Sequence, residues 1–217
     1  MGLRFTRNLS GSLKTLLVAA AVTMLSSNAL ATLLAPSGTV VPSPTASPTG
    51  AALVVDSGAQ PFNSVDGSSF SGTLRTQVFT NDIGNPFGLT GLTFTYLLTN
   101  NGPDALERLV TVNFQGYSTD VAVNNVLVPG AIPVSVDRSA NGRVVGWDYT
   151  GGPGIGAGGN SSLLVIHTDA LQHVAVQNSV INGSVAVVAS FGPIPIPEPA
   201  ALGLAGLAAF GMIRRRK

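Results

Sequence analysis

Three side chains of types that bind metal ions lie close together in the sequence: His167, Asp169 and His173. Imidazole and carboxylate groups are zinc ligands, and a catalytic zinc needs at least three of them around one point. On a strand His167 and Asp169 share a face, whereas His173 needs a turn to return to them. Because the whole chain has two histidines, we expect half-exposed polar residues at a strand end, with no metal site and no cofactor.

A glycine-rich stretch satisfies the dinucleotide pattern Gly-x-Gly-x-x-Gly at Gly154, Gly156 and Gly159. That pattern holds a pyrophosphate only where a helix N-terminus follows directly. Residues 163–166 read Leu-Leu-Val-Ile, which is typical of a strand. We therefore predict a loop between strands and no nucleotide site.

Oxygen-bearing side chains in residues 81–85, together with Asp66 and Asp104, could brace loops through calcium. Their spacing fits no known calcium-binding loop, so the question of a bracing calcium ion stays open at this point.

The chain has no Gly-x-Ser-x-Gly elbow for a nucleophile, and Glu107 is its one glutamate before Glu198. No convincing carboxylate pair for glycoside chemistry stands out. The sequence thus predicts a protein that is not an enzyme.

Trp147 and Tyr149 are two residues apart and therefore share one face of an expected strand. On an exposed face the two rings could stack on a sugar, which would make the domain a carbohydrate-binding module. Large aromatic side chains more often fill the core. The sequence leaves both alternatives, ligand stacking and core packing, open.

The elements that must position these residues are short β-branched segments between residues 51 and 193, separated by Gly, Asn, Asp and Pro. Every second residue of 92–98 is large and apolar, which predicts a strand with one buried face. Strands are expected at residues 52–56, 69–80, 92–100, 108–116, 120–128, 132–136, 143–150, 161–167 and 184–191. Residues 168–177 are a weak helical candidate. Strands at this spacing predict an all-β sandwich. The turn at Asn100-Asn101-Gly102-Pro103-Asp104 resembles the strand-turn-strand of immunoglobulin-like surface modules, which implies an immunoglobulin-like β-sandwich.

The segment before this domain, residues 32–50, contains four prolines among Ser, Thr and Gly. Proline fixes φ and supplies no hydrogen-bond donor, so we expect an extended, unpaired linker. A first strand near Thr39 is the alternative.

The composition of the middle excludes two classes of protein. There is no cysteine, so the core must be stabilised by packing and not by disulfides. All ten acidic residues lie between Asp56 and Glu198. The basic residues of the same part are Arg75, Arg108, Arg138 and Arg143. An acidic surface without lysine is unsuited to nucleic acid and favours solubility.

The N-terminus has the layout of an export signal. Residues 1–14 carry three basic residues and no acid, and an apolar run of residues 15–25 follows. Ala29 and Ala31 form the small-x-small end that signal peptidase cleaves. We predict a signal helix that is removed after Ala31.

The C-terminus combines a rigid tripeptide, Pro197-Glu198-Pro199, with an apolar run of residues 200–213 that carries no charge. The chain then ends on the basic residues Arg214, Arg215, Arg216 and Lys217. As a helix the run would be about 21 Å long at roughly 1.5 Å per residue, against a bilayer core of about 30 Å. This predicts a short, marginal transmembrane helix whose cationic end stays in the cytoplasm.

This arrangement resembles the PEP-CTERM sorting tail of exported bacterial proteins. The resemblance implies that Pro197, Glu198 and Pro199 are recognised by exosortase, a membrane-embedded, cysteine transpeptidase-like enzyme that removes the tail near the tripeptide. Residues 200–213 would be a transient anchor and the basic end a stop. The resemblance also implies a Gram-negative host that makes exopolysaccharide, biofilm or floc.

We therefore expect a signal peptide at residues 1–31, a linker at 32–50, a β-sandwich domain at 51–193 and a sorting tail at 194–217. The expected function is that of an exported surface or extracellular-matrix protein, structural or adhesive, in an exopolysaccharide or biofilm context. The alternative is a carbohydrate-binding module of the matrix. The expected partners are signal peptidase, exosortase, the membrane through the transient tail, and polysaccharide, but not nucleic acid.

Overall fold

The computed structural model describes residues 32–67 and 69–196. All regular structure in these residues is β, which confirms the all-β prediction. The strands are β1 (Thr39–Val40), β2 (Ser43–Pro44), β3 (Ala52–Asn63), β4 (Ser71–Thr80), β5 (Thr93–Asn100), β6 (Arg108–Val112), β7 (Thr119–Asn124), β8 (Ser135–Arg138), β9 (Val144–Asp148), β10 (Leu163–Thr168), β11 (His173–Asn182) and β12 (Ser184–Pro193). Within the described part, no helix is long and apolar enough to cross a bilayer. The expected signal helix and transmembrane helix lie outside the described residues.

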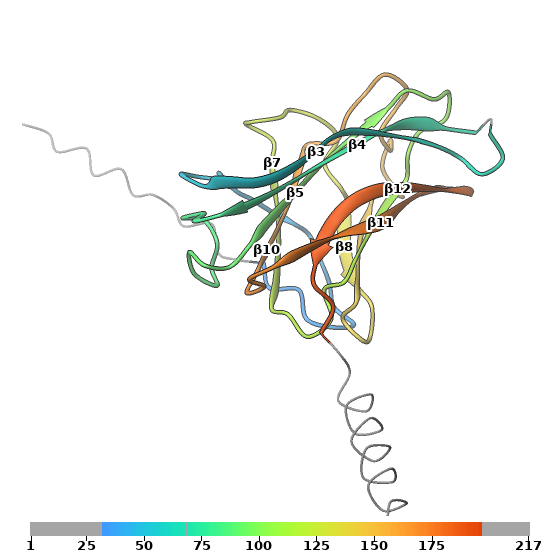
Figure 1. The fold of residues 1–217 in the computed structure, drawn as a ribbon. Coiled ribbons are helices and arrows are strands. Elements are labelled where there is room, and N and C mark those ends of the chain that lie inside the picture. Colours follow the sequence, from blue (N-terminus) through green and yellow to red (C-terminus); the bar gives the residue numbers. More distant parts are fainter. Residues whose placement is uncertain (1–31, 68, 197–217) are drawn as a thin grey trace, which may run out of the picture.

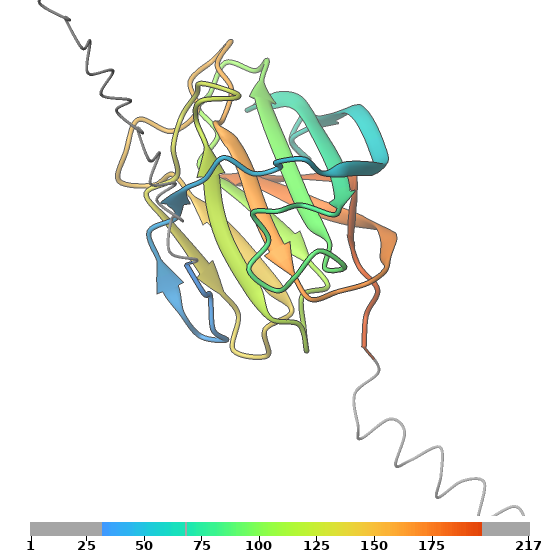
Figure 2. The same ribbon diagram turned by 90° about the vertical axis from the view of Figure 1, so that its left-hand side faces the viewer.

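The strands form two six-stranded sheets that pack face to face (Figures 1 and 2). The first sheet has the order β1-β8-β9-β6-β11-β12, and the second sheet has the order β2-β7-β10-β5-β4-β3. Neighbouring strands are antiparallel except β2 and β7, which are parallel. The two-layer arrangement is the sandwich that the alternating pattern predicted, while the immunoglobulin-like topology stays a prediction.

The core lies between the two sheets and is built mainly from large side chains. Phe94 and Tyr96 on β5, from one sheet, and Trp147 on β9, from the other, have no exposed surface. Phe94 meets Phe114 edge to face, with ring centroids 5.9 Å apart. Such packing supplies the stabilisation that a chain without cysteine cannot obtain from disulfides.

The helical candidate at residues 168–177 is wrong. Its second half is the start of β11, which pairs with β12 along its whole length in a hairpin that turns at Gly183. Gly183 has a φ of 62°, the left-handed conformation that glycine adopts without strain. The hydrogen bonds and the burial of Asn178 and Val180 that this pairing provides outweigh a weak local preference for helix.

The linker prediction for residues 32–50 is also wrong, because this segment is part of the sandwich. β1 pairs with β8 and β2 pairs with β7, so one segment supplies an edge strand to each sheet. Leu34 is fully buried in the core, and its carbonyl accepts a hydrogen bond from Arg138 Nη1 at 2.9 Å. Pro44 is tolerated in β2 because an edge strand needs no donor on its outer side.

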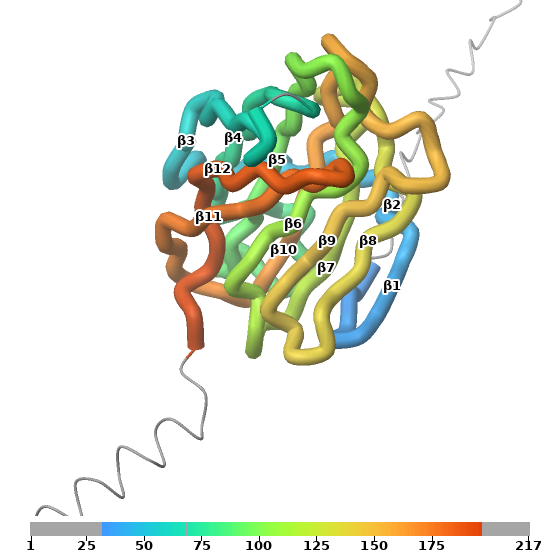
Figure 3. The backbone as a smooth tube through the Cα atoms, turned by 90° about the vertical axis from the view of Figure 1, so that its right-hand side faces the viewer, coloured from blue at the N-terminus to red at the C-terminus, as the bar shows by residue number. Residues whose placement is uncertain are grey.

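Antiparallel pairing gathers the loops at two opposite ends of the sandwich. The exit end, where the described chain finishes, carries residues 81–92, 113–118, 139–143, 169–172 and 194–196. The far end carries residues 64–70, 101–107, 125–134 and 149–162. Figure 3 shows the last described residues at the bottom, beside the loops that follow β6 and β8.

Candidate functional site

The described chain leaves the domain at a fixed point. After β12, Ile194 N donates to Gln172 O at 3.2 Å, and the Tyr117 hydroxyl donates to Ile194 O at 2.8 Å. Ile196 lies over Gly116, where an added Cβ would come within 2.9 Å of its Cδ1 atom. Gly116 has a φ of 82°, so this close approach depends on glycine. Whatever follows Ile196 therefore starts from a defined position on the exit end.

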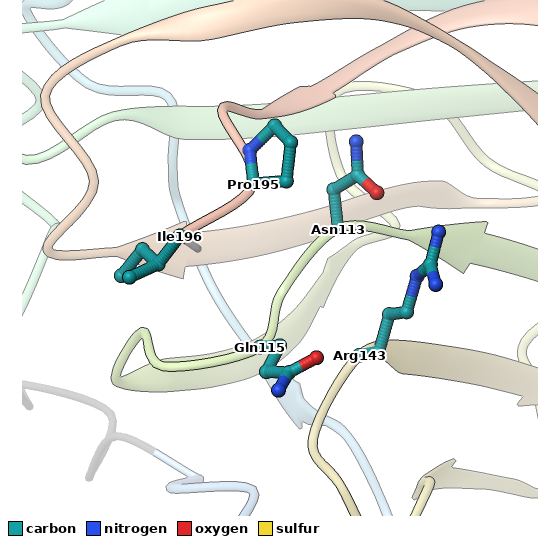
Figure 4. A pocket seen from close by; sticks show the side chains of 5 residues that line it. All are labelled: Asn113, Gln115, Arg143, Pro195 and Ile196. Carbon is teal, nitrogen blue, oxygen red and sulfur yellow. The ribbon is translucent and has the colours of Figure 1, made fainter. Parts of the chain in front are cut away.

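A shallow hollow of about 150 Å³ lies at this point (Figure 4). Its lining consists of Asn113, Gln115, Arg143, Pro195 and Ile196. Asn113 has a φ of 75°, the left-handed conformation that asparagine tolerates better than most residues. The hollow thus sets amide and guanidinium groups beside the apolar surface of the departing chain.

The residues predicted for sorting and export lie outside the described residues. These are Pro197, Glu198, Pro199 and the basic residues 214–217 at one end of the chain, and Ala29 and Ala31 at the other. Pro197 follows Ile196 directly, so the tripeptide begins where the hollow ends.

A second cluster of polar side chains is buried between β7, β10 and the loop after β4. His167 on β10 is paired in register with Asp120 on β7, and its Nδ1 lies 2.7 Å from Asp120 Oδ2. Its Nε2 lies 3.6 Å from Asp82 Oδ2, an ion-pair distance that is too long for a direct hydrogen bond. The three side chains are at most 3 % exposed.

Asp82 also ties the N-terminal segment to the second sheet. Its Oδ1 accepts hydrogen bonds from the backbone N–H groups of Thr49 at 2.9 Å and Gly84 at 3.0 Å. Its Oδ2 accepts from the Thr93 hydroxyl at 2.9 Å. Nearby, Asn124 Nδ2 donates to the carbonyl of Ser47 at 3.0 Å. The carboxylate therefore joins three parts of the fold through hydrogen bonds: β5 through Thr93, the loop after β4 through Gly84, and the N-terminal segment through Thr49.

The charges of this cluster stabilise one another. Burial alone would raise the pKa of Asp82, but the nearby imidazole of His167 and the hydrogen bonds from Thr49, Gly84 and Thr93 outweigh it and lower the pKa to about 2. Burial alone would lower the pKa of His167, but the two carboxylates raise it instead. The imidazole thus lies between two carboxylates that favour its protonated form, closed to substrate by its burial, and we assign the cluster a structural role.

These pKa shifts predict how stability depends on pH. A lowered pKa at Asp82 adds stability above about pH 4, which is lost as the pH falls toward 2. A raised pKa at His167 adds stability below about pH 6.5, which is lost as the pH rises through the folded-state pKa. We expect urea denaturation to give the highest free energy of unfolding between these limits. His167→Gln should flatten the alkaline side, and an unchanged alkaline slope would contradict the assignment.

The structure separates the three residues that could have bound zinc. His167 is buried, so the expectation of a half-exposed position is wrong for it. Asp169 is exposed and accepts a hydrogen bond from Ser118 N at 2.9 Å. His173 is half-buried, with its ring edge to face with Phe191 at 5.6 Å. Across residues 32–67 and 69–196 no three His, Cys, Asp or Glu side chains converge on a metal position.

The residues considered for calcium are not brought together either. Asp82 lies at the exit end, where its oxygens are used in the buried cluster, while Asp66 and Asp104 lie in far-end loops. Residues 154–159 form a loop that leads to β10 and not to a helix, which confirms the loop prediction for the glycine-rich stretch.

The possible stacking role of Trp147 and Tyr149 is contradicted by their burial. Trp147 has no exposed surface and Tyr149 retains 2 %, so neither ring offers a face to a sugar. The shared face predicted for them is the inner face of the first sheet, and both belong to the core. The core alternative therefore holds, and the carbohydrate-binding alternative loses the two residues on which it depended.

Comparison with known proteins identifies the end of the chain. A family model described as the PEP-CTERM protein-sorting motif matches residues 195–217, beginning at Pro195 in the hollow. No curated protein and no solved structure gives a significant match to this chain. The motif indicates an exported protein with a C-terminal, membrane-anchored sorting signal that exosortase processes. The chain is a PEP-CTERM sorting domain-containing protein.

Proposed function

We propose that this chain is a structural or adhesive protein of the outer envelope or extracellular matrix, whose β-sandwich is the cargo of the sorting tail. The observation that carries the proposal is the position of the sorting motif. The motif begins at residue 195, directly after β12 ends at Pro193, on a segment held by Tyr117 and Gln172. Cutting near Pro197-Glu198-Pro199 would release a domain that keeps every described strand.

The use of the polar residues supports a role without catalysis. His167, Asp82 and Asp120, the side chains best suited to proton transfer, are buried in a network that holds the fold together. The aromatic residues suited to sugar binding, Trp147 and Tyr149, fill the core. The polar and aromatic side chains best suited to catalysis or binding therefore stabilise the fold. This is expected of a domain that is displayed or assembled and does not turn over a substrate.

The matrix context is drawn from the resemblance of the tail to those of exported proteins from Gram-negative bacteria that make exopolysaccharide or biofilm. The exported part suits such a place, because its acidic, lysine-free composition favours solubility once the tail is gone. The described strands also need no disulfide.

Intact-mass measurement in the native host tests the sorting step. In cells that contain exosortase, the exported protein should lack Lys217 and the rest of the basic end, whereas cells without the enzyme should retain them. Glu198→Ala should retain the tail in both hosts, because it removes the charged side chain of the recognition tripeptide.

Glu107→Ala is the matched control, since Glu107 is an exposed glutamate at the far end of the domain. It should be processed like the natural protein. Material outside the cell that still carries Lys217 would overturn the proposal, as would normal processing of Glu198→Ala.

A further inference from the structure

We propose that, while the tail is uncut, the exit end of the domain lies against the lipid bilayer and the hollow at Arg143 faces the phosphate groups of anionic lipids. This rests on the membrane-anchored sorting signal of the proposed function. It adds an interaction surface, with a defined orientation, that the sorting motif alone does not provide.

The length of the connection is the first argument. Three residues, 197–199, separate Ile196 from the apolar run that begins at residue 200. A proline-rich segment spans roughly 3 Å per residue, so Ile196 lies about 12 Å from the start of the run. The polar layer on each side of a bilayer is about 5–7 Å thick. Since Ile196 is held to the domain, the exit end must lie within a few ångströms of the lipid headgroups.

The exposed side chains of the exit end are the second argument. Its loops carry large apolar side chains at their tips: Ile83 is 72 % exposed, Leu89 54 % and Leu171 68 %. Residues of this kind enter the interfacial layer at little cost in free energy, whereas carboxylates do not. Apolar tips near a bilayer therefore favour contact with it.

The distribution of charge is the third argument. The exit-end loops hold two exposed charges, Arg143 and Asp169. Asp169 accepts from Ser118 N and interacts electrostatically with the buried Arg138. The far-end loops instead expose Asp66, Asp104 and Glu107 and contain no basic residue. A surface of anionic lipids repels the far end and accepts the exit end. Charge thus decides between two ends that both expose apolar side chains.

Arg143 differs from the other described arginines. Arg75 pairs with Asp56 at 2.6 Å, and Arg108 pairs with Asp137 at 2.5 Å. The guanidinium of Arg138 is buried and donates to backbone carbonyls, including that of Phe114 at 2.6 Å. Arg143 has no carboxylate within ion-pair distance in the described residues. Its side chain lines the hollow beside Asn113, so a lipid phosphate there would lie next to a guanidinium and an amide donor.

Site-directed labelling gives a direct test, because the chain has no cysteine of its own. Full-length protein is purified from a host without exosortase, so that the tail is retained, which intact mass confirms. Leu171→Cys at the exit end and Val126→Cys at the far end are labelled with a fluorophore; both replaced residues are exposed apolar loop residues. The protein is reconstituted in vesicles of phosphatidylethanolamine and phosphatidylglycerol that contain a headgroup nitroxide lipid.

Quenching should be several-fold stronger at position 171 than at position 126. Adding Arg143→Gln should weaken docking about fivefold, the factor expected for one basic residue at an anionic surface. The same substitution should have no effect in phosphatidylcholine vesicles. Arg75→Gln, which makes the same charge change on a side of the domain, is the control and should leave quenching at position 171 unchanged.

Equal quenching at the two positions, or stronger quenching at 126, would overturn the proposed orientation. Quenching at 171 that Arg143→Gln leaves unchanged would overturn the phosphate site. Neither result bears on whether exosortase removes the tail, which intact mass decides separately.

Discussion

Asp82→Ala is expected to destabilise the domain by about 3–5 kcal/mol, the cost of removing one partner from a buried ion pair. The substitution leaves the N–H groups of Thr49 and Gly84 and the hydroxyl of Thr93 without their acceptor. It also leaves the ring of His167 with one carboxylate beside it in place of two. The loss should exceed that of any substitution on the exposed loops.

Urea denaturation followed by tryptophan fluorescence measures this effect, because Trp147 is the single tryptophan and lies in the core. Asp82→Asn keeps one oxygen acceptor and should cost less than Asp82→Ala. Asp169→Ala is the matched control, an exposed carboxylate at the same end, and should cost about 1 kcal/mol, the typical value of a hydrogen bond such as the one it accepts from Ser118 N. If Asp82→Ala and Asp169→Ala lower the free energy of unfolding by the same amount, the structural role assigned to Asp82 is wrong.

Trp147→Ala is expected to cost about 3–5 kcal/mol, the range for removing the largest buried aromatic side chains. The indole is fully buried in the core, on β9, which is paired with both β6 and β8. Removing it leaves a cavity that neighbouring side chains from two sheets cannot fill without moving.

Thermal unfolding followed by far-ultraviolet circular dichroism measures this loss, since the variant has no tryptophan to report on. Trp147→Phe retains much of the buried volume and should cost clearly less. The indole Nε1–H has no hydrogen-bond partner in the described residues, so Phe gives up packing and no hydrogen bond. Retention on a polysaccharide column that Trp147→Ala abolishes without any loss of stability would contradict the core assignment.

Sequence periodicity predicted β4 and β5 as strands, but the second face of β5, expected in solvent, is also buried at Thr93 and Thr95. In β4 every second residue from Gly72 to Val78 is buried, and the expected ranges of both strands agree with the observed bounds to within two residues. A strand of this kind can be predicted because burial of one face produces a local alternation of buried and exposed positions in the sequence. β11 was missed because its partner is β12, and the helix preference of its first residues carries no information about that pairing.

The segment before β3 shows a different limit. Its prolines correctly indicate extended backbone, since proline fixes φ, but they do not say whether the extended chain finds a partner. The pairing of β1 with β8 joins residues about a hundred positions apart, and only the folded chain brings them together.

The buried cluster lay beyond sequence reasoning for the same reason. Asp120 and Asp82 are far from His167 in the chain, and all three meet only when β7 and β10 pair beneath the loop after β4. The nearer residues, Asp169 and His173, were the wrong partners. The sorting tail is the opposite case, because an enzyme that reads a short linear motif needs no fold to present it.

The segment that supplies β1 and β2 also affects how copies of the protein behave when they are crowded outside the cell. Each sheet has one border formed by a two-residue strand, which is too short to template a strand from a neighbouring molecule. The other border of the second sheet, β3, is interrupted by two register shifts and by Pro61. Three of the four borders are therefore poor starting points for cross-β fibrils, and a densely packed population can remain an assembly of separate, folded units.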